Sequence, residues 1–106
     1  MAERHADETP ELRRLRKKID GLDRRIVGLL NERAELGREV GRAKLAAGRR
    51  AIADAERERE VLLRATMANA GPLPQADLLA IYRRLIAATK ALEAQDRRRR
   101  EAPDDA

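Results

Sequence analysis

The sequence of 106 residues lacks the side chains on which most enzyme mechanisms depend. It contains no cysteine, serine, tryptophan or phenylalanine, and it has one tyrosine, Tyr82, and one histidine, His5. Without cysteine or serine a nucleophilic triad has no usual nucleophile, and without cysteine or clustered histidine a zinc or iron–sulfur site has no ligands. We therefore expect no metal, and chemistry that uses only carboxylate, ammonium, guanidinium and amide groups.

Long apolar runs are also absent. No segment approaches the ~18 apolar residues of a membrane span, and none resembles the apolar core of a signal peptide. A chain without cysteine needs no oxidising compartment. The sequence therefore predicts a soluble, cytoplasmic protein with no membrane partner, and its length allows one small domain.

Charge is abundant and unevenly distributed. The chain has 24 Lys and Arg against 19 Asp and Glu, and residues 12–47 alone carry eleven basic and five acidic groups. A basic stripe can bind nucleic acid, but single-strand binders use aromatic stacking platforms, and this chain has one tyrosine. A small polyanionic ligand fits the charge as well, and we expect that partner rather than nucleic acid.

Residues 12–47 have apolar side chains every three or four positions, which predicts one long amphipathic helix bounded by Pro10 and ended by Gly48. Such a helix would extend ~54 Å, whereas a compact domain of this length has a radius of gyration near ~13 Å. It cannot bury its stripe within its own chain, so we expect a two-fold dimer. Four glycines inside the helix suggest close approach of neighbouring helices: Gly21, Gly28, Gly37 and Gly41.

Two further helices follow. Asp54 is a candidate N-cap for a second, short helix that stops near Gly71, and the periodicity that begins at Leu78 predicts a third helix reaching about Gln95. The expected fold class is all-α, with one long, one short and one medium helix, in a two-fold dimer. Residues 11–95 would form the domain, and residues 1–10 and 96–106 would be disordered tails.

Charged residues occupy positions where the helical stripes call for apolar ones. Arg33 and Lys44 are eleven residues, or three turns, apart on the core side of the long helix. Buried cations cost several kcal/mol unless an anion is close, so these two require either an ion pair with Glu58 or Glu93 or an anionic ligand.

The other two predicted helices also direct polar groups inward. Asp54 and Glu58 share one face of the second helix, where a cap and a local pair with Arg57 would explain them, and Thr89 and Glu93 continue the apolar stripe of the third. A core with so many polar groups would be unstable unless it surrounds something polar. The remaining arginines of the long helix are expected on its outer face, in contact with solvent: Arg24, Arg25, Arg38 and Arg42.

With these residues in place, residues 11–95 resemble the all-helical class of chorismate mutases. The resemblance depends on four short motifs in order, the last similar to the family's D-x-x-R-E signature. They are Leu15-Arg16-Lys17-Lys18-Ile19-Asp20, Leu29-Leu30-Asn31-Glu32-Arg33, Val40-Gly41-Arg42-Ala43-Lys44 and Asp54-Ala55-Glu56-Arg57-Glu58.

The resemblance implies an intertwined helical homodimer that rearranges chorismate to prephenate in aromatic amino-acid synthesis, without a cofactor. Arg33 and the partner chain's Arg16 would bind the two substrate carboxylates. The spacing agrees, because 17 residues span ~25 Å on one helix, too far for both to grip one small molecule. The remaining implied roles are Lys44 on a carboxylate and the ether oxygen, Glu58 on the ring hydroxyl, Asp54 and Arg57 at that end of the pocket, Thr89 beside a carboxylate, and Val40 and Ile86 as apolar walls.

Two positions depart from the family pattern. Glu93 stands where bacterial members usually have a glutamine that donates to the ether oxygen, and Lys90 stands near a wall that is usually apolar. A carboxylate cannot donate a hydrogen bond, so Glu93 must be protonated to act there. Burial would raise its pKa and Lys44 would lower it.

Three alternatives stay open. Isochorismate–pyruvate lyase shares the implied fold, although the element from Asp54 to Glu58 favours the mutase because Glu58 offers an acceptor for the ring hydroxyl. A non-catalytic module could bind chorismate or prephenate and act on a shikimate-pathway enzyme in trans. A plain helical dimer could bind nucleic acid through residues 12–47 and 97–100.

Overall fold

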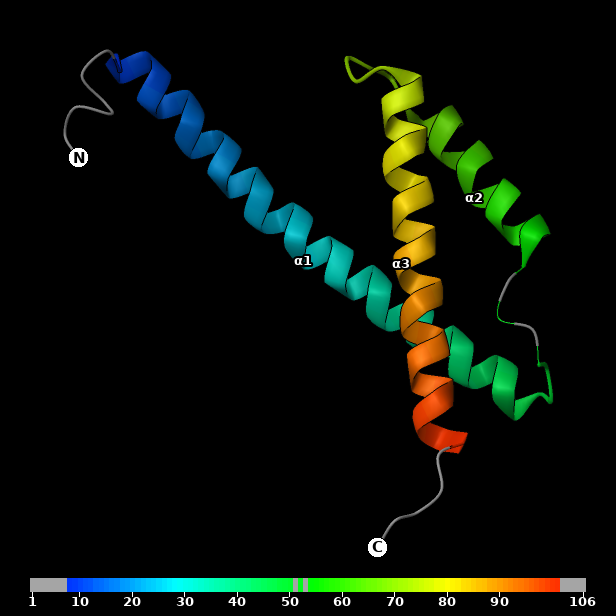
Figure 1. Cartoon of the computed structure of the whole chain (residues 1–106). Coiled ribbons are helices and arrows are strands. Elements are labelled where there is room, and N and C mark those ends of the chain that lie inside the picture. The colour runs from blue at the N-terminus through cyan, green and yellow to red at the C-terminus, as the bar shows by residue number, and fades with distance from the viewer. Residues whose placement is uncertain (1–7, 51, 53, 102–106) are drawn as a thin grey trace, which may run out of the picture. The chain divides into compact units, whose positions relative to one another are not determined.

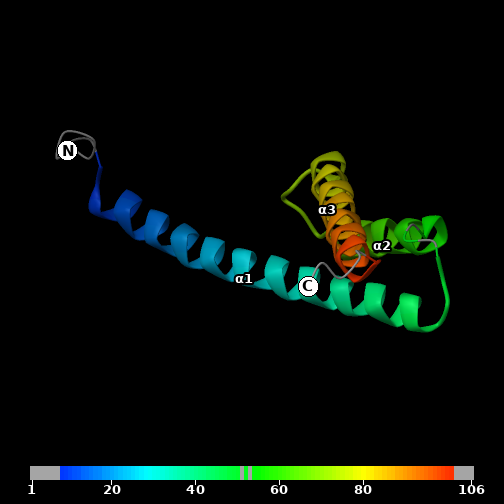
Figure 2. The same cartoon turned by 60° about the horizontal axis from the view of Figure 1, so that its bottom comes forward.

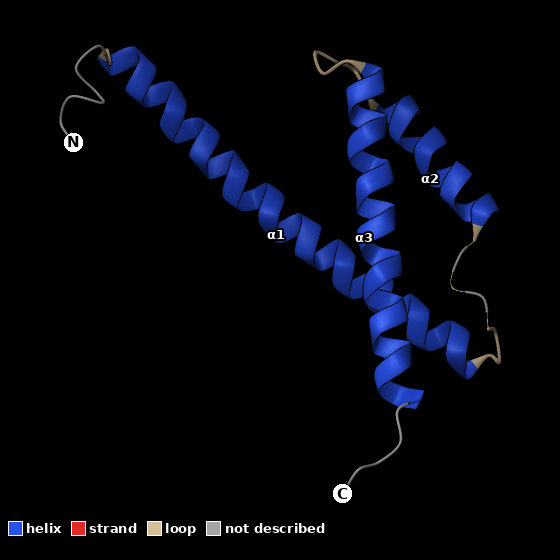
Figure 3. Ribbon diagram, viewed as in Figure 1, coloured by secondary structure: helices blue, strands red, loops and turns tan. Residues whose placement is uncertain are grey.

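The computed structural model describes residues 8–50, 52 and 54–101, which form three helices. These are α1 (Pro10–Ala46), α2 (Ala55–Ala68) and α3 (Gln75–Glu101), shown along the chain in Figure 1. No strand occurs among the described residues (Figure 3). The predicted all-α class, with a long, a short and a medium helix, is confirmed.

The two ends of α1 follow from local capping. The Thr9 hydroxyl accepts a hydrogen bond from the Leu12 amide at 3.1 Å, and Pro10 occupies the first helical position, where its missing N–H costs nothing. At the other end Gly48 adopts a φ of 77°. The Gly48 amide donates to the Leu45 carbonyl and the Arg49 amide to the Lys44 carbonyl, which is a Schellman motif. Gly48 therefore terminates α1 as predicted.

The N-cap of α2 is Asp54, as predicted. Its carboxylate accepts a hydrogen bond from the Arg57 amide at 3.0 Å. The helix ends at Ala68, slightly before the expected stop near Gly71, because the Asn69 side chain organises the turn. Its amide nitrogen donates to the Leu73 carbonyl, and its oxygen accepts from the Gly71 amide.

The third helix is longer than the sequence pattern predicts. It continues past Gln95 to Glu101, so the assignment of residues 96–101 to a disordered tail was wrong. Contacts with distant parts of the chain stabilise this extension, because Asp96 binds Arg38 and the Arg97 guanidinium donates to the Arg50 carbonyl. At the other terminus Glu8, expected in a tail, binds Arg16 at 3.0 Å. Residues 1–7, with His5, and 102–106 lie outside the described residues.

The chain divides into two compact units, residues 1–33 and 34–106. The described part of the first unit is the N-terminal part of α1, whose large apolar side chains are 37–60% exposed. These side chains are Leu12, Leu15, Ile19, Leu22, Ile26, Val27, Leu29 and Leu30. The apolar stripe of this unit is therefore largely exposed.

In the second unit, α2 and α3 lie side by side and antiparallel (Figure 1), and the C-terminal part of α1 packs on α3 (Figure 2). Two glycines permit this packing. A Cβ added at Gly37 would clash with the Thr89 methyl, and one at Gly41 would lie 3.0 Å from the Glu93 Cγ. The expected close approach is thus found at Gly37 and Gly41, whereas an added Cβ at Gly28 would meet nothing within 4 Å.

Candidate active site

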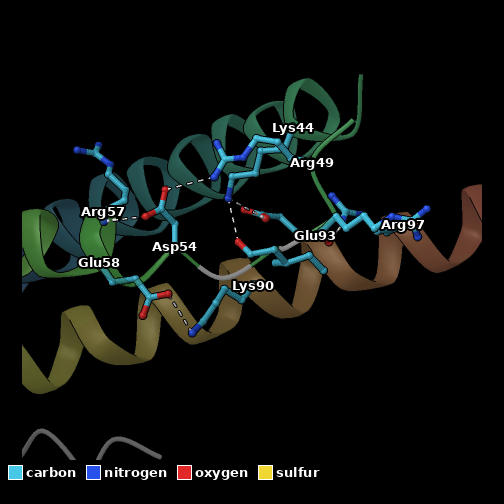
Figure 4. Close-up of polar contacts among 10 residues, drawn as sticks. Lys44, Arg49, Asp54, Arg57, Glu58, Lys90, Glu93 and Arg97 are labelled. Carbon is cyan, nitrogen blue, oxygen red and sulfur yellow. Dashed lines mark hydrogen bonds and ion pairs between the residues drawn. The ribbon is translucent and has the colours of Figure 1, made fainter. Parts of the chain in front are cut away.

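Lys44 places an ammonium group inside the second unit. It lies in the last turn of α1, where a cation suits the helix dipole. Its Nζ donates to the Ile52 carbonyl at 2.9 Å and lies 3.9 Å from Glu93 Oε2 (Figure 4). The side chain is only 12% exposed. Of the two alternatives that the sequence left open for Lys44, an ion pair or an anionic ligand, the structure shows an ion pair, and its partner is Glu93.

Glu93 is the buried charged residue of this cluster, with a side chain 7% exposed. Its Oε2 has no hydrogen-bond partner among the described residues, since 3.9 Å to Lys44 is too long for a hydrogen bond. Burial raises the pKa of Glu93, while Lys44 and Arg97 pull it down less strongly. The net direction is upward, which favours the protonated form that can donate a hydrogen bond.

The contacts of Asp54 and Arg57 stabilise the N-terminal end of α2 itself. The hydrogen bond from the Arg57 N–H to the Asp54 carboxylate is the largest influence and lowers the pKa of Asp54; burial opposes it, and the nearby Arg49 and Lys44 lower the pKa further. The Arg49 guanidinium lies 3.8 Å from this carboxylate. The Arg57 guanidinium instead binds Glu60 at 3.0 Å, so of the cap and the local pair that could explain these residues, the structure shows the cap.

Glu58 and Lys90 form a second ion pair, between α2 and α3. Lys90 Nζ lies 3.1 Å from Glu58 Oε2, and the two side chains are 39% and 29% exposed (Figure 4). The inward position of Glu58 was predicted, but its partner was not. Two carboxylates from different helices thus each face one ammonium group.

Three further residues of the second unit were expected beside the ligand: Thr89, Ile86 and Val40. The Thr89 hydroxyl donates to the Leu85 carbonyl at 3.0 Å, one turn back on α3, and its oxygen can still accept a hydrogen bond. Ile86 is half-buried, whereas Val40 is half-exposed. Their roles beside a ligand stay predictions.

Arg16 and Arg33 belong to the first unit, whereas the cluster around Lys44 and Glu93 belongs to the second. Arg16 is exposed and binds Glu8. Arg33 is partly buried on α1. Their roles as carboxylate ligands also stay predictions.

The sequence analysis missed the pairing of Arg38 with Asp96. Arg38 was expected to need only solvent, but its guanidinium binds the Asp96 carboxylate through two hydrogen bonds of 2.8 and 3.0 Å. Asp96 was assigned to a tail, so no partner for Arg38 could be seen. The signal in the sequence is Gly37, the residue before Arg38. A glycine there permits α3 to pack closely, which brings Arg38 near residues of that helix.

In the described part of the chain, no three His, Cys, Asp or Glu residues are arranged to hold a metal ion. The same residues contain no helix long and apolar enough to cross a membrane. What the fold does bring together is a largely buried ammonium, a buried carboxyl of raised pKa and a second ion pair. The arrangement defines an all-helical protein with an electrostatic site built from three helices.

Comparison with known proteins identifies the family. Residues 15–94 match the family model described as chorismate mutase type II, and the chain belongs to that family. It is 42% identical over 87 residues to the bifunctional chorismate mutase/prephenate dehydratase of Aquifex aeolicus, covering 78% of this chain. The corresponding Escherichia coli protein is 50% identical over 50 residues, or 47% of this chain.

The chain spans only a small part of these curated relatives, 24% of the Aquifex protein and 13% of the E. coli protein. Two solved structures of chorismate mutase from Thermus thermophilus are matched over nearly their whole length. Form II gives a TM-score of 0.75 at 33% identity, covering 79% of this chain and 94% of that one. Form I gives 0.71 at 33% identity, covering 74% and 98%.

Proposed function

We propose that this protein is a chorismate mutase, which rearranges chorismate to prephenate, and that residues 11–95 form its catalytic domain. The observation that carries the proposal is the buried pair of Lys44 and Glu93, 3.9 Å apart, with a Glu93 oxygen that has no hydrogen-bond partner among the described residues. A donor pair of this kind suits an oxygen on which negative charge develops.

The reaction needs no nucleophile, metal, cofactor or proton transfer. A Claisen rearrangement breaks the ether C–O bond while a C–C bond forms within the same molecule. The enzyme has to hold the dianion in its compact reactive conformer and to stabilise charge on the ether oxygen. The side-chain inventory of this sequence, without cysteine or serine, is sufficient for that task.

In this proposal Lys44 and protonated Glu93 donate to the ether oxygen. Burial keeps the pKa of Glu93 raised, so its neutral form is accessible, and Lys44 supplies the point charge. Glu58 accepts from the ring hydroxyl at the other end of the site.

The two carboxylates of the substrate are bound by arginines, whose planar guanidinium groups bind carboxylates bidentately. Arg33 comes from the same chain, and Arg16 comes from a second copy, which is required because the helix separates them by ~25 Å. The exposed apolar stripe of α1 supports such a dimer. The proposed secondary contacts are Asp54, Arg57, Thr89, Val40 and Ile86.

The test is loss of chorismate ultraviolet absorbance, with prephenate identified as the product. We expect turnover by the wild-type protein and loss of at least about a hundredfold in kcat/KM for Arg33→Ala. Arg25→Ala, which removes an exposed cation of the same helix, is the control and should retain activity. Circular dichroism and the dimer mass must be unchanged in both variants.

Two results would contradict the proposal. No turnover by an intact dimer across pH 4–8, with chorismate still bound, would indicate the non-catalytic module. Release of pyruvate from isochorismate, with chorismate left unchanged, would indicate the lyase.

A further inference from the structure

Lys90 lies in an unexpected place for a substrate-binding site of this family. It follows Thr89 directly and precedes Glu93 by one turn of α3, and its Nζ lies 3.1 Å from Glu58 Oε2 on α2 (Figure 4). Both side chains are partly buried, Lys90 at 39% and Glu58 at 29% exposure. The pair therefore joins α2 to α3 beside the residues assigned to the site.

The negative charge of Glu58 is unfavourable for binding an anionic ligand, and Lys90 lies close enough to offset it. In the proposed reaction the ligand is a dianion, and a carboxylate in a partly buried site repels it more strongly than one in open solvent. Two neighbouring polar residues at this end of α2 have partners of their own, since Asp54 caps the helix and Arg57 binds Glu60. The ammonium of Lys90 offsets the charge of Glu58.

We propose that Lys90 is a positioning residue that neutralises Glu58 and holds its carboxylate as a hydrogen-bond acceptor without repelling the anionic substrate. This inference rests on the proposed function. It predicts an effect on substrate binding, and thus on KM, because the charge of Glu58 acts equally on the bound substrate and on the transition state.

The experiment compares kcat and KM for chorismate in Lys90→Met, Lys90→Arg, Glu58→Gln and the Lys90→Met/Glu58→Gln double variant. We expect Lys90→Met to raise KM about tenfold with kcat within about twofold, and Lys90→Arg to stay within about threefold of wild type. In the Glu58→Gln background, Lys90→Met should change KM less than about twofold, because no charge remains to be offset.

Arg84→Met is the matched control, because Arg84 is an exposed cation on the same helix. It should leave KM unchanged, which separates the local pair from the overall positive charge. Titration calorimetry with prephenate measures binding independently of turnover, and its dissociation constant should follow the pattern of KM.

An unchanged KM in Lys90→Met would overturn the inference while leaving the mutase proposal intact. An equal rise of KM in the Glu58→Gln background would also overturn it, because Lys90 would then act on the substrate directly. A wild-type protein that neither converts chorismate nor binds prephenate would refute both.

Discussion

Glu93 experiences two opposed influences on its pKa. Burial against α1, with Gly41 close to its Cγ, disfavours the charged form, and the nearby Lys44 favours it. Burial dominates, so the pKa of Glu93 is raised above its ordinary value of 4.5. A neutral carboxyl can donate to an ether oxygen as an amide does, which explains how a glutamate can serve at this position.

The raised pKa predicts a pH-dependent activity. In the proposed reaction the protonated form of Glu93 is the active one, so the rate should increase as the pH falls below neutrality, and above the pKa of Glu93 it should drop about tenfold per pH unit. Glu93→Gln replaces the titrating group by a permanent donor, so its kcat should vary less than about threefold over the same range. The measurement is kcat against pH for both proteins.

Unfolding at each pH is the control, because loss of the fold would mimic loss of activity. The raised pKa also means that the folded state binds more protons than the unfolded state between the unfolded and the folded pKa. Glu93 therefore stabilises the fold less as the pH rises through that range. A pH–rate profile unchanged by Glu93→Gln would refute the assigned role.

At the scale of the helices, packing between α1 and α3 depends on the small residues at the contact. Gly37 faces the methyl group of Thr89, and Gly41 faces the Cγ of Glu93. Next to them Arg38 and Asp96 join the same two helices, and the hydrogen bond from Arg38 lowers the pKa of Asp96. The glycines set the distance between the helices, and the ion pair lies beside them.

Gly37→Ala should therefore destabilise the protein although alanine favours helices. The new Cβ would clash with the Thr89 methyl, and forcing such a contact apart costs about 1–3 kcal/mol. Gly28→Ala, also within α1, is the control. Its Cβ would meet nothing within 4 Å, so the variant should gain up to about 1 kcal/mol from helix propensity.

Urea unfolding followed by circular dichroism at one fixed protein concentration measures both changes. Equal stability of the two variants would show that the α1–α3 contact tolerates a methyl group, which contradicts the packing argument.

For the molecule as a whole, the main feature that needs a partner is the exposed apolar stripe of the first unit. Leu22, Ile26 and Leu29 are 50–60% exposed. Among the described residues, Ala65 is the one buried apolar residue, so the second unit has a small core of its own. A second copy that covers the stripe would supply the missing core and bring the partner's Arg16 to the site in the proposed dimer.

Shared sites predict complementation between inactive variants. Arg16→Ala and Arg33→Ala should each be nearly inactive, but refolding them together forms mixed dimers in which one site has both arginines. With random pairing, about a quarter of wild-type activity should return.

A mixture of Arg33→Ala with Lys44→Ala is the matched control, because both residues belong to the same half of each proposed site. No site in that mixture is complete, so no activity should return. Recovery in the control, or none in the Arg16→Ala mixture, would contradict a site shared in this way.

Much of this protein is determined by local sequence pattern. The spacing of leucines and isoleucines, Asp54 as a cap and Gly48 in a left-handed conformation define the helices, because caps and amphipathic stripes act within a few residues. The inward positions of Lys44 and Glu93 also follow from helical periodicity.

The tertiary structure alone decided which charges meet. Lys90 with Glu58, and Arg38 with Asp96, are pairs between helices, and their contact depends on how those helices pack, which no local pattern specifies. The sequence also could not show whether the pKa of Glu93 is raised or lowered. The direction is the balance of burial against the charges of Lys44 and Arg97, and burial exists only once the helices are packed.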